Sequence, residues 1–177
     1  MQFQQREWSN STTFAMTLLV ALAVTPQALR ADELLTFGQL TGMHCQGASA
    51  KSVPGFAVST FSLADSVKTS PGGSTGTASF TDVNVVKGLD DCTPLLFGAV
   101  ARGTRFTSAT LTVVSKVSFE AVLLIQLQDV VVSGARFTEG AANLLDEVVS
   151  LSYAKIKITH VPSGKSFSWD VVKNVLL

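Results

Sequence analysis

Histidine and cysteine are the residues most able to hold a metal ion or attack a substrate, and this chain has few of either. Its two histidines are His44 and His160, and its two cysteines are Cys45 and Cys92. Neither the Cys-x2-Cys spacing nor the paired-histidine spacing of metal sites is present. A site that gathers all four residues is conceivable, but a solvated loop histidine and a strand-end histidine explain the pattern better. We therefore predict that no metal is bound.

Carboxylates and hydroxyls offer other routes to catalysis. Asp90 and Asp91 are adjacent and could act as a general acid and base, yet neighbouring acids before a helix more often cap it or face its positive end. No Gly-x-Ser-x-Gly nucleophile elbow occurs. The Gly-rich segment 69–76 lacks the Gly-Lys-Ser/Thr ending of a phosphate-binding loop. We predict no catalytic residue and no cofactor-binding residue, and therefore a protein that is not an enzyme.

Two aromatic residues near the C-terminus could bind a ligand without taking part in catalysis. Phe167 and Trp169 occupy alternate positions of an expected strand, so both rings lie on one face and could form a binding platform. Aromatic residues in this arrangement more often pack against neighbouring strands. We interpret the pair as packing residues.

An apolar segment near the N-terminus bears on where the chain resides. Residues 14–24 are apolar except for Thr17, and Pro26 and a small-residue stretch ending at Ala31 follow. This order is typical of a secretory signal peptide, and the run is too short for a permanent membrane anchor. We predict a signal peptide over residues 1–31 and export to the periplasm or the extracellular space. A buried N-terminal helix is the alternative.

Both cysteines follow the predicted signal peptide. An even number of cysteines in an exported chain favours a disulfide, here between Cys45 and Cys92. Such a bond would close a loop of about 48 residues and stabilise the fold by roughly 4 kcal/mol. Two separate buried thiols, which behave as small apolar side chains, are the alternative.

Length and composition indicate one folded domain. The chain has 177 residues, of which 46% are apolar and 15% charged, so it can bury a sizeable core. Its formal net charge is zero, and no positive field therefore gathers a polyanion. We predict a single domain over residues 32–177 that binds no nucleic acid.

A two-residue periodicity dominates this domain and predicts β strands. The segment 119–133 is so apolar that it requires burial on both faces or a bend. Residues 134–146, which include Gly134 and Gly140, are expected to be a connection. The expected strands span residues 34–40, 55–68, 77–87, 106–115, 119–133, 148–161 and 166–172.

One short helix interrupts the strands. Thr93 is its expected N-cap, Pro94 occupies the first turn, and Gly103 can end the helix. The residues expected on its packed face are Leu95, Leu96, Ala99 and Val100. Closure hides strand edges that would otherwise recruit other chains. We therefore predict a mostly β fold, a small closed β-barrel with one short flanking α-helix.

Four phrases in this order resemble one known family. The phrase at 78–106 gives a strand, then Lys, Asp and Pro, then a helix, Gly and an aromatic residue; its matching positions are Phe80, Lys87, Asp91, Pro94, Leu95, Gly103 and Phe106. The other phrases are residues 125–133, residues 147–159, and the group Trp169, Asp170, Lys173 and Asn174. Together they resemble the hemolysin-coregulated protein (Hcp) family, the tube protein of type VI secretion, over about residues 34–174.

This resemblance implies a β-barrel subunit that assembles into six-membered rings, which stack into a tube. We accordingly expect an exported, non-enzymatic structural protein whose partners are copies of itself and other secretion components. The predicted signal peptide departs from the family pattern, because familiar tube proteins lack one. It favours an alternative, a stand-alone Hcp-like binding module in the periplasm or extracellular space that meets a cell-surface ligand.

Overall fold

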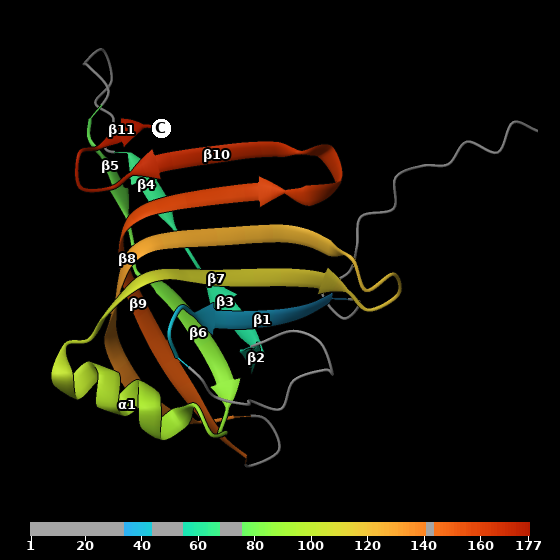
Figure 1. Ribbon diagram of the computed structural model, residues 1–177, viewed down its shortest axis with the longest axis vertical. Helices are drawn as coiled ribbons and strands as arrows, with labels where there is room; N and C mark the ends of the chain where they lie inside the picture. Colours follow the sequence, from blue (N-terminus) through green and yellow to red (C-terminus); the bar gives the residue numbers. More distant parts are fainter. Residues whose placement is uncertain (1–33, 44–54, 68–75, 141–143) are drawn as a thin grey trace, which may run out of the picture.

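A computed structural model describes residues 34–43, 55–67, 76–140 and 144–177 of the chain (Figure 1). The predicted signal peptide, His44 and Cys45 lie outside the described residues, as does most of the Gly-rich segment 69–76.

The described residues form eleven β strands, one α-helix and one short 3-10 helix. The first half of the chain contains β1 Leu34–Leu40, β2 Phe56–Val58, β3 Thr60–Ser62, β4 Asp65–Val67, β5 Ala78–Phe80, β6 Val83–Gly88 and α1 Thr93–Arg102. The second half contains β7 Arg105–Ser115, β8 Ala121–Glu139, β9 Leu145–His160, the 3-10 helix Val161–Ser163, β10 Lys165–Asp170 and β11 Val175–Leu176. The predicted mostly β class with one α-helix is confirmed for the described residues.

Two long strands, β8 and β9, connect the parts of the main sheet. Its strand order is β11-β10-β9-β8-β7-β1-β2, and β9 also pairs with β6, which pairs with β3. The first half of β9 pairs with β6, whereas its second half pairs with β10. In Figure 1, β1, β7, β8, the second half of β9 and β10 run side by side across the front, and β6 and the first half of β9 cross behind them. The β4 and β5 strands form a separate two-stranded sheet.

The predicted bend in the apolar segment 119–133 takes the form of a bulge. The register between β8 and β9 shifts between Val132 and Gly134, and bulges bend a strand and increase its twist. The chain then continues as β8 to Glu139 and returns as β9 from Leu145. The predicted connection over 134–146 is therefore wrong for most of its length, because Gly134 is accommodated within the ladder and does not end it.

The segment expected as one strand over 55–68 is divided into three. β2 pairs with β1, and after Ser59 the chain changes partner, so that β3 pairs with β6. The Ser59 N–H donates to the Val86 carbonyl over 2.8 Å at this change. A third piece, β4, forms a hairpin with β5. A change of strand partner does not alter the alternation of apolar and polar residues along the chain. For this reason the sequence predicted a single strand.

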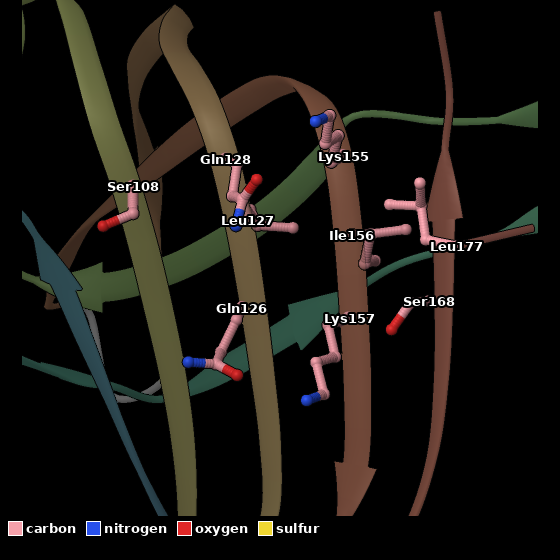
Figure 2. A pocket seen from close by; sticks show the side chains of 9 residues that line it. All are labelled: Ser108, Gln126, Leu127, Gln128, Lys155, Ile156, Lys157, Ser168 and Leu177. Carbon is pink, nitrogen blue, oxygen red and sulfur yellow. The ribbon is translucent and has the colours of Figure 1, made fainter. Parts of the chain in front are cut away.

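One face of the front strands is polar. Gln39, Thr110, Gln126, Lys157 and Ser168 are successive Cα partners across β1, β7, β8, β9 and β10. All five side chains are exposed or half-buried, and Figure 2 shows this face from close by. Alternation along each strand places the apolar residues on the opposite face.

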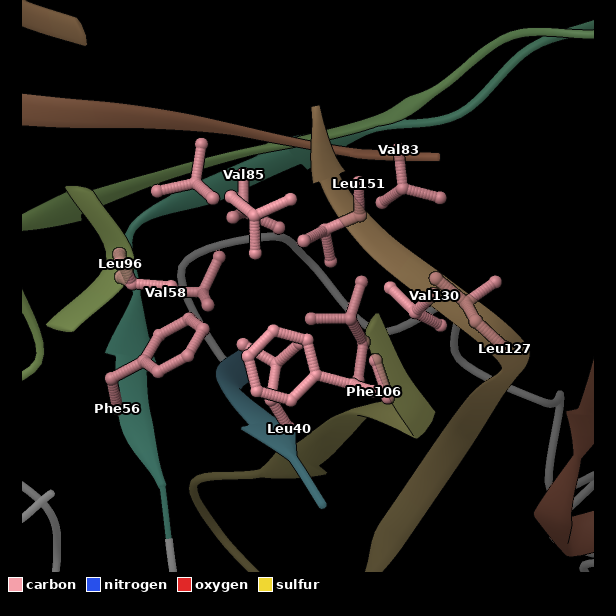
Figure 3. Packing of buried hydrophobic residues seen from close by; sticks show 14 of the residues in the cluster. Leu40, Phe56, Val58, Val83, Val85, Leu96, Phe106, Leu127, Val130 and Leu151 are labelled. Atoms are coloured by element: carbon pink, nitrogen blue, oxygen red, sulfur yellow. The ribbon is translucent and has the colours of Figure 1, made fainter. Parts of the chain in front are cut away.

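The opposite face forms the hydrophobic core (Figure 3). The front strands contribute Leu40, Leu111, Leu127 and Ile156, and the crossing strands contribute Val83, Val85, Val149 and Leu151. Phe56 of β2 lies fully buried between them. A β-carbon at Gly38 would lie 2.5 Å from the Phe56 ring, so glycine at this position permits the ring to pack against β1.

The helix α1 completes one end of the core through Leu96 and Ala99, which are almost fully buried. Gly103 ends it in the left-handed conformation, with φ of 60°, as predicted. The predicted N-cap is wrong by one residue, since Cys92 is the N-cap and no side chain caps the helix there. Leu95 is 40% exposed, so the expected packed face is also wrong at that position.

Candidate assembly surfaces and a buried polar cluster

The most deeply buried charged groups are Lys87 of β6 and Glu147 of β9. Both side chains are 0% exposed, and the Lys87 Nζ lies 3.0 Å from the Glu147 Oε2. Their strands pair in antiparallel register, with Lys87 opposite Glu147. Burial of a charge is costly unless the charge is paired and hydrogen-bonded, so this register is strongly constrained.

Neighbouring groups satisfy most of the pair's hydrogen-bonding capacity. Lys87 also donates to the Asp90 carboxylate over 2.7 Å and to the Gly88 carbonyl over 2.9 Å. The Thr93 hydroxyl donates to Glu147 Oε2 over 2.8 Å, and Asp90 Oδ1 accepts the Cys92 N–H. Glu147 Oε1 has no hydrogen-bond partner among the described residues. The cluster therefore fastens the start of α1 to β6 and β9.

This cluster accounts for several residues that the sequence singled out. Asp90 and Asp91 do not act as a pair, because Asp90 binds Lys87 whereas Asp91 is exposed. Thr93 is the first residue of the helix, and its hydroxyl accepts the Asp90 N–H and donates to Glu147. The sequence placed Lys87 and Glu147 in two separate phrases and gave no sign that they touch, since hydropathy does not report a contact between residues 60 positions apart.

Contacts within the fold account for the other candidate residues, His160 and Cys92. His160 is exposed, and its Nδ1 lies 2.8 Å from the Ser163 hydroxyl. Among the residues that the structure describes, no cluster of three or more His, Cys, Asp or Glu side chains could hold a metal. Cys92 is fully buried, and Cys45, its predicted disulfide partner, lies outside the described residues.

The aromatic pair at the C-terminus packs as the sequence predicts. The Trp169 ring lies 6.1 Å from the Phe80 ring and 6.1 Å from the Phe167 ring, measured between centroids. Phe167 remains 39% exposed, whereas Trp169 packs against the core. Trp169 therefore joins β10 to β5.

Among the described residues, most of the exposed large apolar side chains belong to two groups that lie far apart. The helix-end group surrounds α1 and the adjoining ends of β6, β8 and β9; its members are Leu89, Leu95, Phe137, Leu144 and Leu145. The C-terminal group follows β10; its members are Val172, Val175 and Leu176. In Figure 1, α1 lies at the bottom and β11 at the top. Exposed apolar clusters of this kind are typical of protein–protein contacts.

A separate pair of exposed apolar residues lies at the tip of the β7–β8 hairpin. Val117 is 79% exposed and Phe119 is 73% exposed. Two hydrogen bonds stabilise the turn that contains them. Ser115 Oγ accepts the Val117 N–H, and the Phe119 N–H donates to the Ser115 carbonyl. The pair is smaller than either apolar group and lies at the right of Figure 1.

The described part of the chain contains no helix that is both long enough and apolar enough to cross a bilayer.

A sequence profile of the family described as "Type VI secretion system effector, Hcp" matches residues 51–160, more than half of the chain. No curated protein matches the sequence significantly.

Solved structures of the same description share the fold. Hcp1 from Salmonella typhimurium superposes with a TM-score of 0.69 at 19% identity, over 82% of this chain and 99% of that one. A structure described as a type six secretion system protein gives 0.70 at 18% identity, over 81% and 99%. The secreted protein Hcp3 from Pseudomonas aeruginosa gives 0.54 at 20% identity, over 77% and 96%. At these identities the similarity establishes the fold alone.

Proposed function

Because the chain belongs to the type VI secretion system effector family Hcp, we propose that it is a non-enzymatic structural subunit that assembles into hexameric rings. The observation that carries this proposal is the presence of two different apolar groups on separate parts of one protomer. A ring requires a heterologous contact, in which one surface of each subunit meets a different surface of the next. The helix-end and C-terminal groups supply two such surfaces.

A closed barrel gives such a ring rigid walls. Segment 56–62 belongs to the β1 ladder through β2 and to the β6 ladder through β3. It therefore bridges the two ends of the strand path that runs from β1 through β7, β8 and β9 to β6. We propose that this bridge closes the barrel and leaves few free strand edges near the core.

Export and a disulfide belong to the same proposal. A signal peptide over residues 1–31 would deliver the domain to an oxidising compartment, where Cys45 and Cys92 would form a bond. Mass spectrometry of the secreted protein, alkylated without reductant, should detect no free thiol. Alkylation of both cysteines would contradict the bond.

The alternative function is a stand-alone exported module of the same fold that binds a cell-surface ligand. The apolar run at 14–24 and the two cysteines favour it, because neither is needed by a tube that assembles in the cytoplasm. A protein that remains monomeric at all concentrations would support this alternative over the ring.

The ring contact can be tested with one variant on each apolar group. Leu95→Glu charges the helix-end group and Leu176→Glu charges the C-terminal group, and each variant alone should be monomeric by light scattering. An equimolar mixture should form a one-to-one dimer, because each protomer retains the surface that its partner lacks.

Val117→Glu is the matched control, since it charges an exposed apolar residue outside both groups and should leave the ring intact. A mixture that remains monomeric, or single variants that assemble as the wild type does, would contradict the proposed contact.

A further inference from the structure

The polar face of the front strands contains a shallow cavity of about 190 Å³ (Figure 2). Its lining comes from β7, β8, β9 and β10, with Leu177 at the edge. The polar residues that line it are Ser108, Gln126, Gln128, Lys155, Lys157 and Ser168. Most of the lining side chains lie on the face of the sheet opposite the hydrophobic core, whereas Leu127 and Ile156, which also line the cavity, belong to the core.

The strand register arranges four of these side chains in two adjacent pairs. Gln126 is the Cα partner of Lys157, and Gln128 is the Cα partner of Lys155. Directly opposed residues on antiparallel strands have β-carbons about 4.5–5.5 Å apart. Each lysine thus has a glutamine directly across the strand pair.

The two lysines carry positive charge and form no ion pair with the described residues, although the Asp170 carboxylate is on the neighbouring strand opposite Lys155. Among the described residues, neither Lys155 nor Lys157 forms an ion pair, and no carboxylate side chain lines the cavity. Asp129, which borders the adjoining surface, is bound to Arg105 over 2.9 Å. Asp170, opposite Lys155, is buried and accepts the Lys173 N–H.

We propose that this cavity binds an extended acidic polypeptide segment. Lys155 and Lys157 are two residues apart on one strand, and alternate residues of a strand are about 6.6–6.8 Å apart. Side chains at alternate positions of an extended peptide have the same backbone spacing. Lysine side chains are long and flexible, so two carboxylates of the peptide can meet the two ammonium groups. Gln126 and Gln128 present both a donor and an acceptor, which suits the N–H and C=O groups of a peptide backbone.

The charge of the site argues against a nucleic acid as the ligand. Nucleic-acid affinity arises largely from many neutralised phosphates, whereas this cavity offers two lysines and the chain as a whole has zero net charge.

A labelled peptide gives a direct test. The probe is a fluorescein-labelled peptide of alternating Glu and Thr, and a Gln and Thr peptide of the same length is the neutral comparison. Fluorescence anisotropy with the full mature protein should show binding of the acidic peptide, weakened by high salt, and much weaker binding of the neutral one.

Two double variants test whether the acidic peptide binds at the lysines of the cavity. The double variant Lys155→Gln/Lys157→Gln should bind the acidic peptide about tenfold more weakly, as expected for the loss of two exposed charge pairs. The matched control Lys165→Gln/Lys173→Gln removes two lysines outside the cavity and should stay within about twofold of the wild type.

Four results would overturn the proposal: no binding of the acidic peptide, equal binding of the neutral peptide, unchanged binding by the cavity variant, or an equal loss in the control. Displacement of the peptide by inorganic phosphate at the same concentration would overturn the assignment to a polypeptide and leave a simple anion site. The wild-type salt dependence and the two peptides need no variant, so the proposal stays testable if a variant fails to fold.

Discussion

The buried ammonium of Lys87 illustrates how single residues determine the register of this fold. It contacts Glu147, Asp90 and the Gly88 carbonyl, and it lies 5.7 Å from the centre of the Phe56 ring. Removal of one partner from a buried ion pair leaves an uncompensated charge, which costs about 3–5 kcal/mol. An exposed ion pair typically contributes less than about 1 kcal/mol.

We therefore predict that Lys87→Met lowers the free energy of unfolding by about 3–5 kcal/mol in chemical denaturation. The double variant Lys87→Met/Glu147→Gln should be less destabilised than the sum of the two single variants, because it removes both charges. Arg105→Met, which breaks an ion pair whose side chains are 70% and 56% exposed, is the control and should cost under about 1 kcal/mol. Equal losses for Lys87→Met and Arg105→Met would contradict this account.

Tyr153 provides a second prediction at the residue scale. Burial, and then the nearby carboxylates of Asp82 and Asp65, raises the pKa of Tyr153 to about 12 from 10.0. Its hydroxyl also donates to the Thr81 carbonyl over 3.1 Å. Tyr153 is the only tyrosine in the chain, so the ultraviolet absorbance of tyrosinate follows this one group. The titration midpoint should lie near pH 12, and a midpoint near 10 would contradict the described surroundings.

The raised pKa also fixes the direction of a stability change. Between pH 10 and about 12 the unfolded chain loses the tyrosine proton while the folded chain retains it, so the unfolded state gains stability. The contribution of Tyr153 is thus fully present below pH 10 and is lost as the pH rises through 12. Tyr153→Phe should remove this part of the alkaline loss of stability, as measured by denaturation at a series of pH values.

At the scale of elements, Gly103 at the C-terminal end of α1 shows how backbone conformation supports the helix. Gly103 has a φ of 60°, and no atom lies within 4 Å of a β-carbon built there. Gly103→Ala should therefore destabilise the protein by about 1 kcal/mol through backbone strain alone. Gly88→Ala is the control, because Gly88 has equal space and no positive φ. Thermal unfolding that affects both variants equally would contradict the role given to Gly103.

The sequence predicted elements well where local signals decide them. The strand over 34–40 agrees with β1, the strand over 106–115 differs from β7 by one residue, and Gly103 ends the helix as expected. Each of these depends on alternation or on a glycine whose conformational freedom is a local property.

Predictions failed where distant contacts override a local signal. Gly134 suggested a turn, but pairing with β9 retains it in the ladder as a bulge. Leu95 suggested the packed face of α1, but the Lys87 cluster sets the orientation of the helix and leaves Leu95 exposed. The polar cavity was not predicted either, because Gln126 and Lys157 become neighbours only through strand register.

At the scale of the whole molecule, the two apolar groups and the polar face lie on different parts of the surface, and we propose a different role for each. The helix-end and C-terminal groups suit contacts between protomers, whereas the polar face offers hydrated groups that suit a ligand. Neither the apolar groups nor the polar face is proposed to carry out a chemical reaction. Ring formation is the central step of the proposed function.

Negative-stain electron microscopy of the processed domain, residues 32–177, tests that step most directly. The account predicts closed rings of six protomers, which charging either Leu95 or Leu176 abolishes. Uniform single particles of protomer size, at concentrations well above those of typical assembly, would contradict it.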